Sequence, residues 1–290
     1  MSENWAEAIA DRIAGTGSPL KGRLLLLGAA DTGKTSLLNA LASHLAKNQP
    51  AALVDADDGQ SHIGPPTTVG WTLIDGATAT AAEYEAKGIA FVGDITPVGH
   101  LLQLTAALAL CVEQAAQVAE VILIDTPGLV TGGAACTLWW TVQRLLRPER
   151  IVAIQRENEL GEVLRGLHPG LSAIETIEAP QELRRKSPEI RQEYRRRLFD
   201  DYFRDAASHT LDFGTLAVRT ANGMTVENAA GRLVGLADVT GQDVAIGVIE
   251  QWRQEQAKGI IRAPRMNMQR VRCLTIGNAR IATPFGWSKV

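Results

Sequence analysis

The residues of this chain that most clearly predict chemistry form the stretch GAADTGKT, from Gly28 to Thr35. It fits the pattern GxxxxGK[ST] at every fixed position, follows an apolar run and opens an Ala/Leu-rich segment, which is the context of a phosphate-binding loop. Backbone N–H groups of such a loop surround phosphate oxygens, and the start of the next helix adds positive potential. We predict that these residues bind the phosphates of a nucleotide: Gly28, Asp31, Thr32, Gly33, Lys34, Thr35 and Ser36.

The lysine and threonine of this loop and two later aspartates have distinct expected roles. Lys34 is expected to reach the β- and γ-phosphate oxygens, and the Thr35 hydroxyl to ligate Mg²⁺, which keeps most of its waters. Asp55 and Asp57 end the next apolar run and, two residues apart on a strand, are expected to face the same side. At the carboxyl edge of a sheet, one carboxylate can serve Mg²⁺ while the other accepts a proton from an attacking hydroxyl.

A further acidic stretch leaves the phosphate acceptor open. IDTPG, from Ile124 to Gly128, looks like the DxxG element of a GTPase, but no [NT]KxD element for guanine follows it in the sequence. An ATPase that remodels partners needs no guanine element, and Asp125 would then be a carboxylate near Mg²⁺. Hydrolysis and transfer to a bound hydroxyl are therefore both compatible with these motifs.

A basic segment downstream favours transfer to a hydroxyl. Residues 184–197 hold seven Lys/Arg against two Glu, in a chain whose net charge is −3. Ser187 is expected to cap a helix with Pro188 at its first position. Arg191 and Arg195 then lie on one helix face, as in a lid that closes over a transferring phosphate. A solvated basic helix face is the alternative interpretation.

The elements that must position these residues predict an α/β fold: a P-loop kinase-like, doubly wound, mainly parallel sheet. Continuous apolar runs indicate strands buried on both faces, and Ala/Leu-rich segments between them indicate helices. The expected strands are residues 23–28, 51–56, 89–94, 121–126, 150–155 and 172–179. The expected helices are residues 34–47, 98–118, 134–147 and 159–167.

Changes in composition and apolar patterning along the chain predict three parts. Residues 1–20 read as a short amphipathic helical segment, and residues 21–207 as the P-loop domain with a lid at 182–204. Residues 208–290 contain short strands and glycine turns, which predict a small β-rich C-terminal domain with a strand pair around Gly277. His62, His100, His168 and His209 show no metal-ligand spacing and are interpreted as structural or exposed, although His100 follows a segment where it could touch phosphate.

Composition narrows the setting of the protein. In 290 residues there is no overall basic charge, so any nucleic-acid site must be a local patch. Three widely spaced cysteines form neither a metal motif nor a disulfide framework, which indicates a reducing, cytoplasmic compartment. The N-terminus lacks the apolar core of a signal peptide, and no apolar run is long enough to span a membrane.

Several motifs together resemble the polynucleotide 5′-hydroxyl kinase family, the RNA-processing P-loop kinases. That family shows a P-loop, a DxDxGQ motif, a TxGW clasp and an RxxxR lid. Here these read GAADTGKT (28–35), DADDGQ (55–60), TPGL (126–129) and RQEYR (191–195). FVGDITPVGHLLQL (91–104) and GRLVGLADVTGQDVAIGVIE (231–250) are similar to a substrate-contact segment and to the C-terminal β module of the family.

The resemblance implies ATP- and Mg²⁺-dependent transfer of the γ-phosphate to the 5′-hydroxyl end of RNA or DNA. It implies that Lys34 acts on the phosphates, that Asp57 deprotonates the hydroxyl with Asp55 beside the metal, and that Arg191 and Arg195 close on ATP. The metal ligands implied are Thr35 and Asp55. The implied contacts with the nucleic acid are Gln60, Thr96, Thr126, Gly128 and Leu129.

Two departures from the family pattern affect substrate binding. Leu129 stands where the clasp has tryptophan, and leucine lacks the aromatic face whose stacking contributes about 1–3 kcal/mol per base. Trp71 either replaces it or, as its apolar neighbours favour, lies in the core. Larger relatives carry an extra β domain before the P-loop, whereas here only about twenty residues precede the first strand, and their helix is expected to cover the adenine side in its place.

Two other functions remain as alternatives. One is an ATP-binding scaffold of an RNA-processing complex without kinase activity, and the other is a P-loop NTPase switch. The intact aspartates and lid arginines favour the kinase, for which protein partners in RNA processing are also expected.

Overall fold

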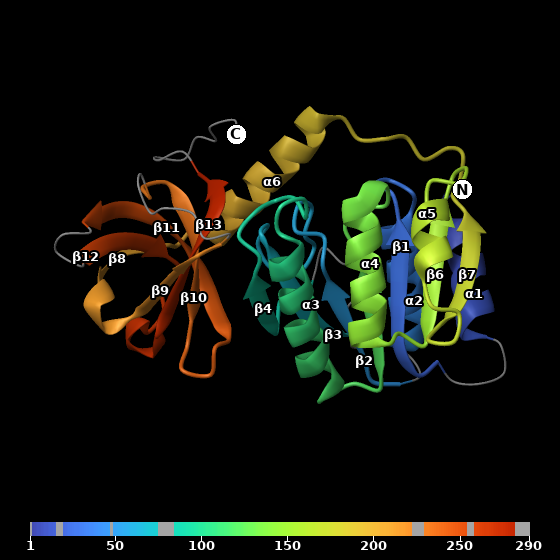
Figure 1. The fold of residues 1–290 in the computed structure, drawn as a ribbon, viewed down its shortest axis with the longest axis horizontal. Helices are drawn as coiled ribbons and strands as arrows, with labels where there is room; N and C mark the ends of the chain where they lie inside the picture. The colour runs from blue at the N-terminus through green and yellow to red at the C-terminus, as the bar shows by residue number, and fades with distance from the viewer. Residues whose placement is uncertain are drawn as a thin grey trace.

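The central feature of the fold is a sheet with the strand order β7-β6-β1-β5-β2-β3-β4 (Figure 1). The structure is a computed structural model and describes residues 2–15, 20–46, 49–74, 84–221, 229–253 and 258–281. Five strands run parallel: β1 (Gly22–Gly28), β2 (Ala51–Asp55), β5 (Val121–Asp125), β6 (Arg150–Gln155) and β7 (Ala173–Glu178). The expected doubly wound, mainly parallel sheet is confirmed.

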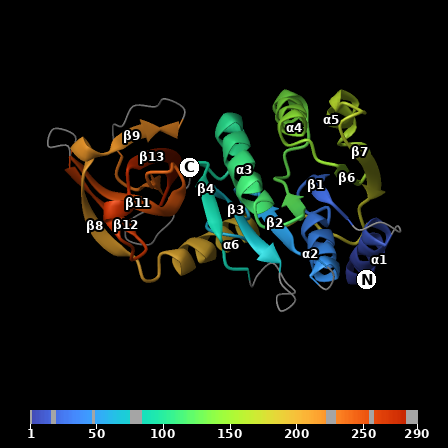
Figure 2. The same ribbon diagram turned by 90° about the horizontal axis from the view of Figure 1, so that it is seen from below.

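Helices cover both faces of this sheet, as Figure 2 shows. One face carries α1 (Ser2–Ala14) and α2 (Lys34–Leu45); the other carries α3 (Leu101–Ala116), α4 (Gly132–Leu146) and α5 (Gly161–Gly166). The leucines of β1 explain the arrangement, because Leu25 and Leu27 pack into one core layer while Leu24 and Leu26 pack into the other. A strand that is apolar at every position needs cover on both sides.

The sheet departs from the prediction at its edge nearest the C-terminal part. β3 (Thr68–Ile74) was not among the expected strands, and it pairs antiparallel with β2 and with β4 (Gly88–Phe91). The expectation of a parallel strand over 89–94 is therefore wrong about its neighbours. Trp71, on β3, is 9% exposed, and its indole N–H donates to Gln114 Oε1 at 2.7 Å. This confirms the core interpretation of Trp71.

A separate β-rich module follows, with its own core. We use "C-terminal module" for its strands β8 (Ala207–Asp212), β9 (Ala217–Thr220), β10 (Arg232–Ala237), β11 (Asp243–Arg253), β12 (Lys258–Ala263) and β13 (Cys273–Arg280), and its 3₁₀ turns Phe213–Thr215 and Met268–Arg270. The expected strand pair around Gly277 is wrong, because β13 continues through that glycine as one strand. The module meets the edge of the main sheet where Phe91 N donates to Asp243 Oδ2 at 2.7 Å.

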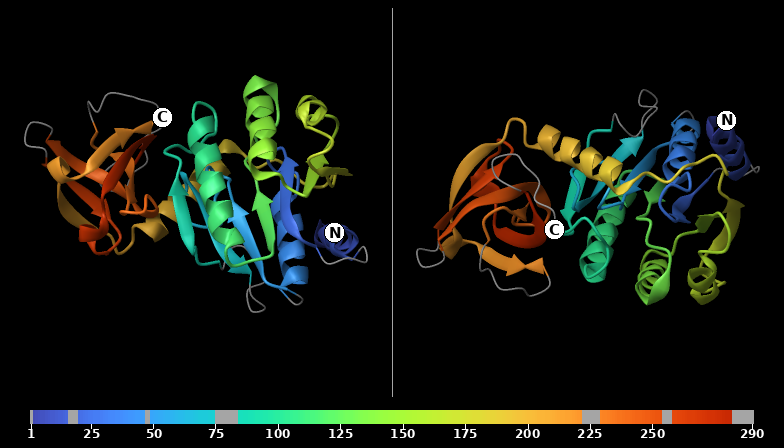
Figure 3. Two further views of the ribbon diagram at one scale, coloured as in Figure 1. Left: turned by 60° about the horizontal axis from the view of Figure 1, so that its bottom comes forward. Right: turned by 90° about the horizontal axis from the view of Figure 1, so that it is seen from above.

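Helix α6 (Pro188–Tyr202) connects the two parts, and Figure 3 shows it crossing the carboxyl edge of the main sheet. Ser187 accepts a hydrogen bond from Ile190 N, so the expected cap is confirmed. Phe199 and Phe203 at the far end of α6 are buried against apolar residues of the module. We propose the three-part division at residues 20 and 207 on these grounds. None of the described helices is both long and apolar enough to cross a lipid bilayer.

The contact between β13 and the loop after β4 is tight enough to test. A Cβ at Gly277 would lie 2.6 Å from Gly93 O and 2.8 Å from Phe91 Cζ. We expect Gly277→Ala to lower the free energy of unfolding by about 1–3 kcal/mol, because the β13–Gly93 contact must open. Gly133→Ala is the control, since nothing lies within 4 Å of its Cβ position. Urea unfolding that gives equal losses for both variants would contradict this.

Candidate active site

The P-loop (residues 28–35) turns between β1 and α2 at the carboxyl edge of the sheet. Gly33 has a φ of 97°, a left-handed conformation that glycine adopts without steric cost. A Cβ there would lie 3.1 Å from Leu183 Cδ1 and 3.2 Å from Trp5 Cζ3. The P-loop is therefore covered by a side chain of α1 and by one of the segment that precedes α6.

Lys34 is held inside the P-loop. Its ammonium donates to Gly28 O at 2.8 Å and to Ala29 O at 2.9 Å, and the residue is only 6% exposed. Thr32, which is fully buried, also donates its hydroxyl to Ala29 O. The lysine charge is thus placed within the loop, where a bound phosphate would meet it together with the N-terminus of α2.

Thr35 and Asp125 supply adjacent oxygen atoms. The Thr35 hydroxyl donates to Asp125 Oδ2 at 3.3 Å, while Asp125 Oδ1 accepts from Thr126 N at 2.8 Å. Burial raises the pKa of Asp125, and the Lys34 charge partly offsets that rise. A hydroxyl and a buried carboxylate are hard oxygen ligands that suit Mg²⁺, which takes one or two protein ligands with phosphates and water. The residues therefore fit this cation.

Asp55 lies beside Asp125 on the neighbouring strand but is not among the residues that line the pocket. β2 ends at Asp55, so Asp57 lies in the following loop, and the expectation that both share one strand face is wrong. Asp55 Oδ1 accepts from Asp57 N at 2.9 Å, and Asp55 Oδ2 accepts from the backbone N–H groups of His62 and Ile63. Burial, followed by the charges of Asp125 and Asp57, raises the pKa of Asp55. Its carboxylate thus shapes the loop of residues 57–63.

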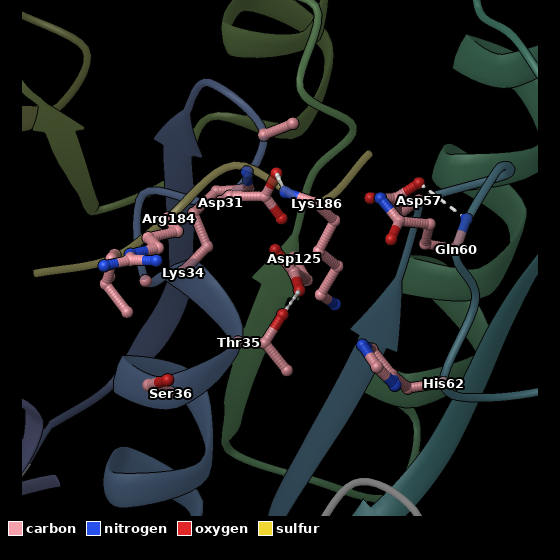
Figure 4. Close-up of a pocket in the computed structure, with 13 residues that line it drawn as sticks. Asp31, Lys34, Thr35, Ser36, Asp57, Gln60, His62, Asp125, Arg184 and Lys186 are labelled. Atoms are coloured by element: carbon pink, nitrogen blue, oxygen red, sulfur yellow. Dashed lines mark hydrogen bonds between the residues drawn. The ribbon is translucent and has the colours of Figure 1, made fainter. Parts of the chain in front are cut away.

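Asp57 faces the pocket from that loop. Its Oδ1 accepts from Gln60 N at 3.0 Å and from Gly59 N at 3.2 Å, so Oδ2 is the oxygen available to a bound hydroxyl (Figure 4). Gln60 lines the same wall. The structure thus brings Asp57 and Gln60 into one pocket with the P-loop, and their predicted roles at an acceptor site stay predictions.

The segment that leads into α6 is bound to the P-loop through Asp31. Asp31 Oδ2 accepts from Lys186 N at 2.9 Å and from the Arg191 guanidinium at 2.5 Å. The guanidinium of Arg156, at the end of β6, donates to Asp31 O and to Leu183 O. Arg156 was not predicted as a site residue, because nothing in its local sequence shows that β6 ends beside the P-loop.

The other side of α6 contacts the loop that carries Asp57. The Tyr194 hydroxyl lies 3.0 Å from His62 Nδ1 and 3.3 Å from Ser61 O. Burial, reinforced by Arg191, lowers the pKa of Arg195, while the charge of Asp57 raises it. Arg191 and Arg195 therefore lie close to one another, as predicted, and Arg195 interacts electrostatically with Asp57.

The reading of His62 as structural or exposed is incomplete, because its ring lines the pocket (Figure 4). Burial lowers the pKa of His62, an effect that Asp125 and Asp57 oppose and Lys186 reinforces. A lone histidine five residues after Asp57 carries no sequence signal of this position.

The pocket has a volume of about 180 Å³. This is below the roughly 300–1,000 Å³ of sites that enclose drug-sized ligands, so the pocket fits phosphates rather than a whole nucleotide. Its lining residues come from the P-loop, the Asp57 loop, β5 and the lid: Ala30, Asp31, Gly33, Lys34, Thr35, Ser36, Asp57, Gln60, His62, Asp125, Leu183, Arg184 and Lys186.

The predicted clasp residues do not line this pocket. Thr126 is fully buried and donates its hydroxyl to Leu26 O at 2.6 Å. Gly128 approaches the P-loop so closely that a Cβ would lie 2.6 Å from Ala30 N. Leu129 packs against the core, and its carbonyl accepts from the Trp139 indole at 2.6 Å. Their predicted contacts with nucleic acid stay predictions.

Thr96 lies at the rim, in the segment of residues 94–99 that follows β4. The side chain is exposed, and a Cβ at Gly59 would lie 2.9 Å from Ile95 O. The segment therefore packs directly on the loop that carries Asp57, on the acceptor side of the pocket.

Asp58 gives a pH-dependence that can be measured. Its side chain is buried without a partner for Oδ2 among the described residues, and burial raises its pKa, followed by the charges of Asp57, Asp94 and Asp55. A carboxyl group whose pKa is raised in the folded state stabilises the fold most at a pH below its unfolded-state pKa of about 3.9. This stabilisation is lost as the pH rises through its folded-state pKa. We expect Asp58→Asn to flatten the fall in unfolding free energy as the pH rises above about 4, measured by urea titration.

The exposed Asp205→Asn serves as the control and should leave the wild-type slope unchanged. Identical pH slopes for the wild type and Asp58→Asn would show that Asp58 titrates as it does in the unfolded chain.

Comparison with curated proteins finds several similar proteins that are named polyribonucleotide 5′-hydroxyl-kinases. That of Pyrococcus abyssi is 29% identical over 185 residues, 63% of this chain and 51% of its own length. Those of Thermococcus kodakarensis and Methanocaldococcus jannaschii are 31% and 27% identical, over 63% and 69% of this chain and 52% and 55% of theirs. The chain thus spans about half the length of these relatives.

Among solved structures, wild-type Clp1p in its complex with Pcf11p (454–563) superposes with a TM-score of 0.71 at 14% identity. The match covers 96% of this chain and 78% of that one, which supports the fold. Residues 28–205 match the family described as the mRNA cleavage and polyadenylation factor CLP1 P-loop. Because that match covers more than half of the sequence, the chain belongs to the CLP1 P-loop family, as its motifs indicated.

Proposed function

We propose that the protein is a polynucleotide 5′-hydroxyl kinase that transfers the γ-phosphate of ATP to a 5′-hydroxyl end of RNA or DNA. One observation carries the proposal: Asp57 lines the same pocket as the P-loop, its Oδ1 is held by backbone N–H groups, and Arg195 on the lid lies close enough to feel its charge. The names of the curated relatives support the same reaction.

The donor side holds the phosphates. P-loop N–H groups and Lys34 bind the β- and γ-phosphate oxygens, and Thr35 and Asp125 would hold Mg²⁺. When bound, Mg²⁺ neutralises charge that develops on the bridging oxygens. We thus assign the metal-side carboxylate to Asp125 rather than Asp55, because Asp55 is used by backbone N–H groups.

The acceptor side activates the hydroxyl. The 5′-oxygen attacks the γ-phosphorus, the bond from that phosphorus to the β–γ bridging oxygen breaks, and ADP leaves. The hydroxyl proton passes to Asp57 Oδ2, while Arg191 and Arg195 stabilise charge on the transferring group. Arg191 must exchange its contact with Asp31 for one with phosphate, so nucleotide binding and lid position are coupled.

The turn after β6 favours ATP over GTP. Arg156 occupies this turn and binds the P-loop and lid backbones, and no guanine-binding motif is present there in the sequence. The setting we propose is the cytoplasm, supported by the free thiols of Cys111, Cys136 and Cys273. We also propose protein partners in RNA processing, supported by the complex in which Clp1p was solved.

Asp57→Asn tests the base. Asparagine keeps the size of the side chain but cannot take the proton, so we expect transfer of labelled γ-phosphate to a 5′-hydroxyl strand to fall about 10²–10⁴-fold with ATP affinity retained. Asp58→Asn, next in sequence but buried, should retain transfer. Retained transfer in Asp57→Asn would exclude Asp57 as the base. If the wild type releases phosphate from ATP without transferring it to the strand, the protein is an NTPase and not a kinase.

Arg195→Ala tests the lid. A cation at the transferring phosphate contributes about 10³–10⁵-fold, so we expect kcat to fall by about 10³ or more with unchanged binding of the strand. Arg196→Ala is the matched control, because Arg196 is on the same helix but pairs with Glu193 and Asp200 at the surface. Equal kcat values for the two variants would remove Arg195 from the reaction.

A further inference from the structure

The C-terminal module differs in charge from the rest of the chain. Residues 208–290 contain ten Lys/Arg against six Asp/Glu, whereas residues 1–207 contain nineteen against twenty-six. The basic excess therefore lies in the module, although the reaction site proposed above lies in the other part. A surface with this excess next to an acceptor site fits a polyanion.

A continuous chain of contacts joins the acceptor side to this module. The segment of residues 94–99 packs on Gly59, as described above, and the preceding Gly93 O accepts from Asn278 N at 2.8 Å and from Ala279 N at 3.0 Å. Figures 2 and 3 show the module beside β4 and the start of α3, where this segment lies. β13 is thus the element of the module that meets the acceptor side.

A buried histidine fixes this junction. Asn278 Nδ2 lies 2.8 Å from His100 Nε2, and His100 Nδ1 lies 3.3 Å from Val98 O. These two contacts hold the His100 ring between the 94–99 segment and β13. His100 is 3% exposed, so it positions the 94–99 segment on β13 and is not open to phosphate, contrary to the sequence expectation.

Two arginines lie side by side immediately beyond this junction. Arg232 on β10 and Arg280 on β13 are register partners. Arg232 Nη1 donates to Gly277 O at 3.2 Å and Asn278 O at 3.3 Å, while Arg280 Nη1 donates to Ala230 O at 2.8 Å. Backbone carbonyls therefore orient both guanidinium groups, whose planar forks match the geometry of a phosphate.

The arginine pair lacks charge compensation at Arg232. Burial, followed by the charge of Arg280, lowers the pKa of Arg232, which places the two cations close together. Arg232 forms no ion pair within the described parts of the chain, and its Nε is buried without a partner there. A phosphodiester group placed between the forks would relieve the repulsion and supply bidentate acceptors.

We propose that Arg232 and Arg280 bind backbone phosphates of the acceptor strand on the 3′ side of its reacting nucleotide. This inference rests on the proposed function, because it extends the same acceptor site. The ligand is a single-stranded nucleic-acid backbone, recognised by charge rather than by base sequence. Asn278 and His100 are positioning residues that set the pair beside the 94–99 segment.

The test uses the double variant Arg232→Gln/Arg280→Gln of the full chain. We measure binding of a fluorescent 5′-hydroxyl strand, with Mg²⁺ and a non-hydrolysable ATP analogue, as a function of salt. Each lost phosphate contact should reduce the slope of log affinity against log salt by about 0.7. In parallel, KM for a long strand should rise about tenfold, with KM for a dinucleotide and for ATP unchanged.

Control variants separate charge from folding. Arg265→Gln removes an exposed arginine of the same module and should change neither the slope nor KM. Arg232→Lys keeps the charge and should retain most of the salt slope. Arg280→Gln alone removes one of the two cations, so the salt slope should fall less than in the double variant. The unfolding free energies of all variants show whether the module is intact.

The outcomes distinguish this proposal from the kinase itself. A wild type that binds the strand with arginine-dependent salt slope but transfers no phosphate would overturn the kinase and retain the surface. Normal transfer with equal slopes in wild type and double variant would overturn the surface and retain the kinase. Polyglutamate that binds in an arginine-dependent way, with no such dependence for the strand, would also overturn it in favour of an acidic protein partner.

Discussion

Four aspartates converge at the carboxyl edge of the β1–β5–β2 region, and the repulsion between them shapes the site. Asp55 and Asp125 are register partners on adjacent strands, and Asp57 and Asp58 follow within three residues. Burial raises the pKa values of Asp55, Asp58 and Asp125. Gathering so many carboxylates away from water is costly unless each receives compensation from its surroundings.

The compensation differs for each of these aspartates, and that difference separates their roles. Asp55 is stabilised by backbone N–H groups, so it builds the loop. Asp125 lies beside Thr35 and Lys34, where a bound divalent cation would compensate the rest of its negative charge. Asp57 lines the pocket, and only its Oδ1 is used by backbone N–H groups. On the function we propose, identical side chains thus acquire structural, metal-side and proton-accepting roles from their neighbours.

The lid connects this edge to the C-terminal module. The start of α6 binds the P-loop through Asp31, its middle contacts His62 through Tyr194, and its far end packs Phe199 against the module. The module in turn holds the loop after β4 through Asn278 and Gly93. The donor side, the acceptor side and the module are therefore connected by one network of contacts. Through these contacts, a strand bound on the module would affect the position of the lid.

Local motifs allowed much of this to be predicted. The P-loop, the capped lid helix at Ser187 and the buried parallel strands all follow from short-range chemistry, since each depends on neighbouring residues. The antiparallel β3 was missed, because Gly70 in its centre interrupts the apolar run that its burial on both faces would otherwise give. The P-loop and lid residues were correctly placed together, although their detailed roles stay proposals.

The sequence by itself determined the residue types and the order of the motifs. From these followed a phosphate-binding loop, an acidic loop close behind it and a basic helix. Only the tertiary structure decided which aspartate faces the pocket, that His62 and Arg156 belong to the site, and that Arg232 meets Arg280. These depend on where a chain turns after each strand and on which distant backbone groups are left to accept hydrogen bonds. Such contacts join residues far apart in sequence, so no local pattern encodes them.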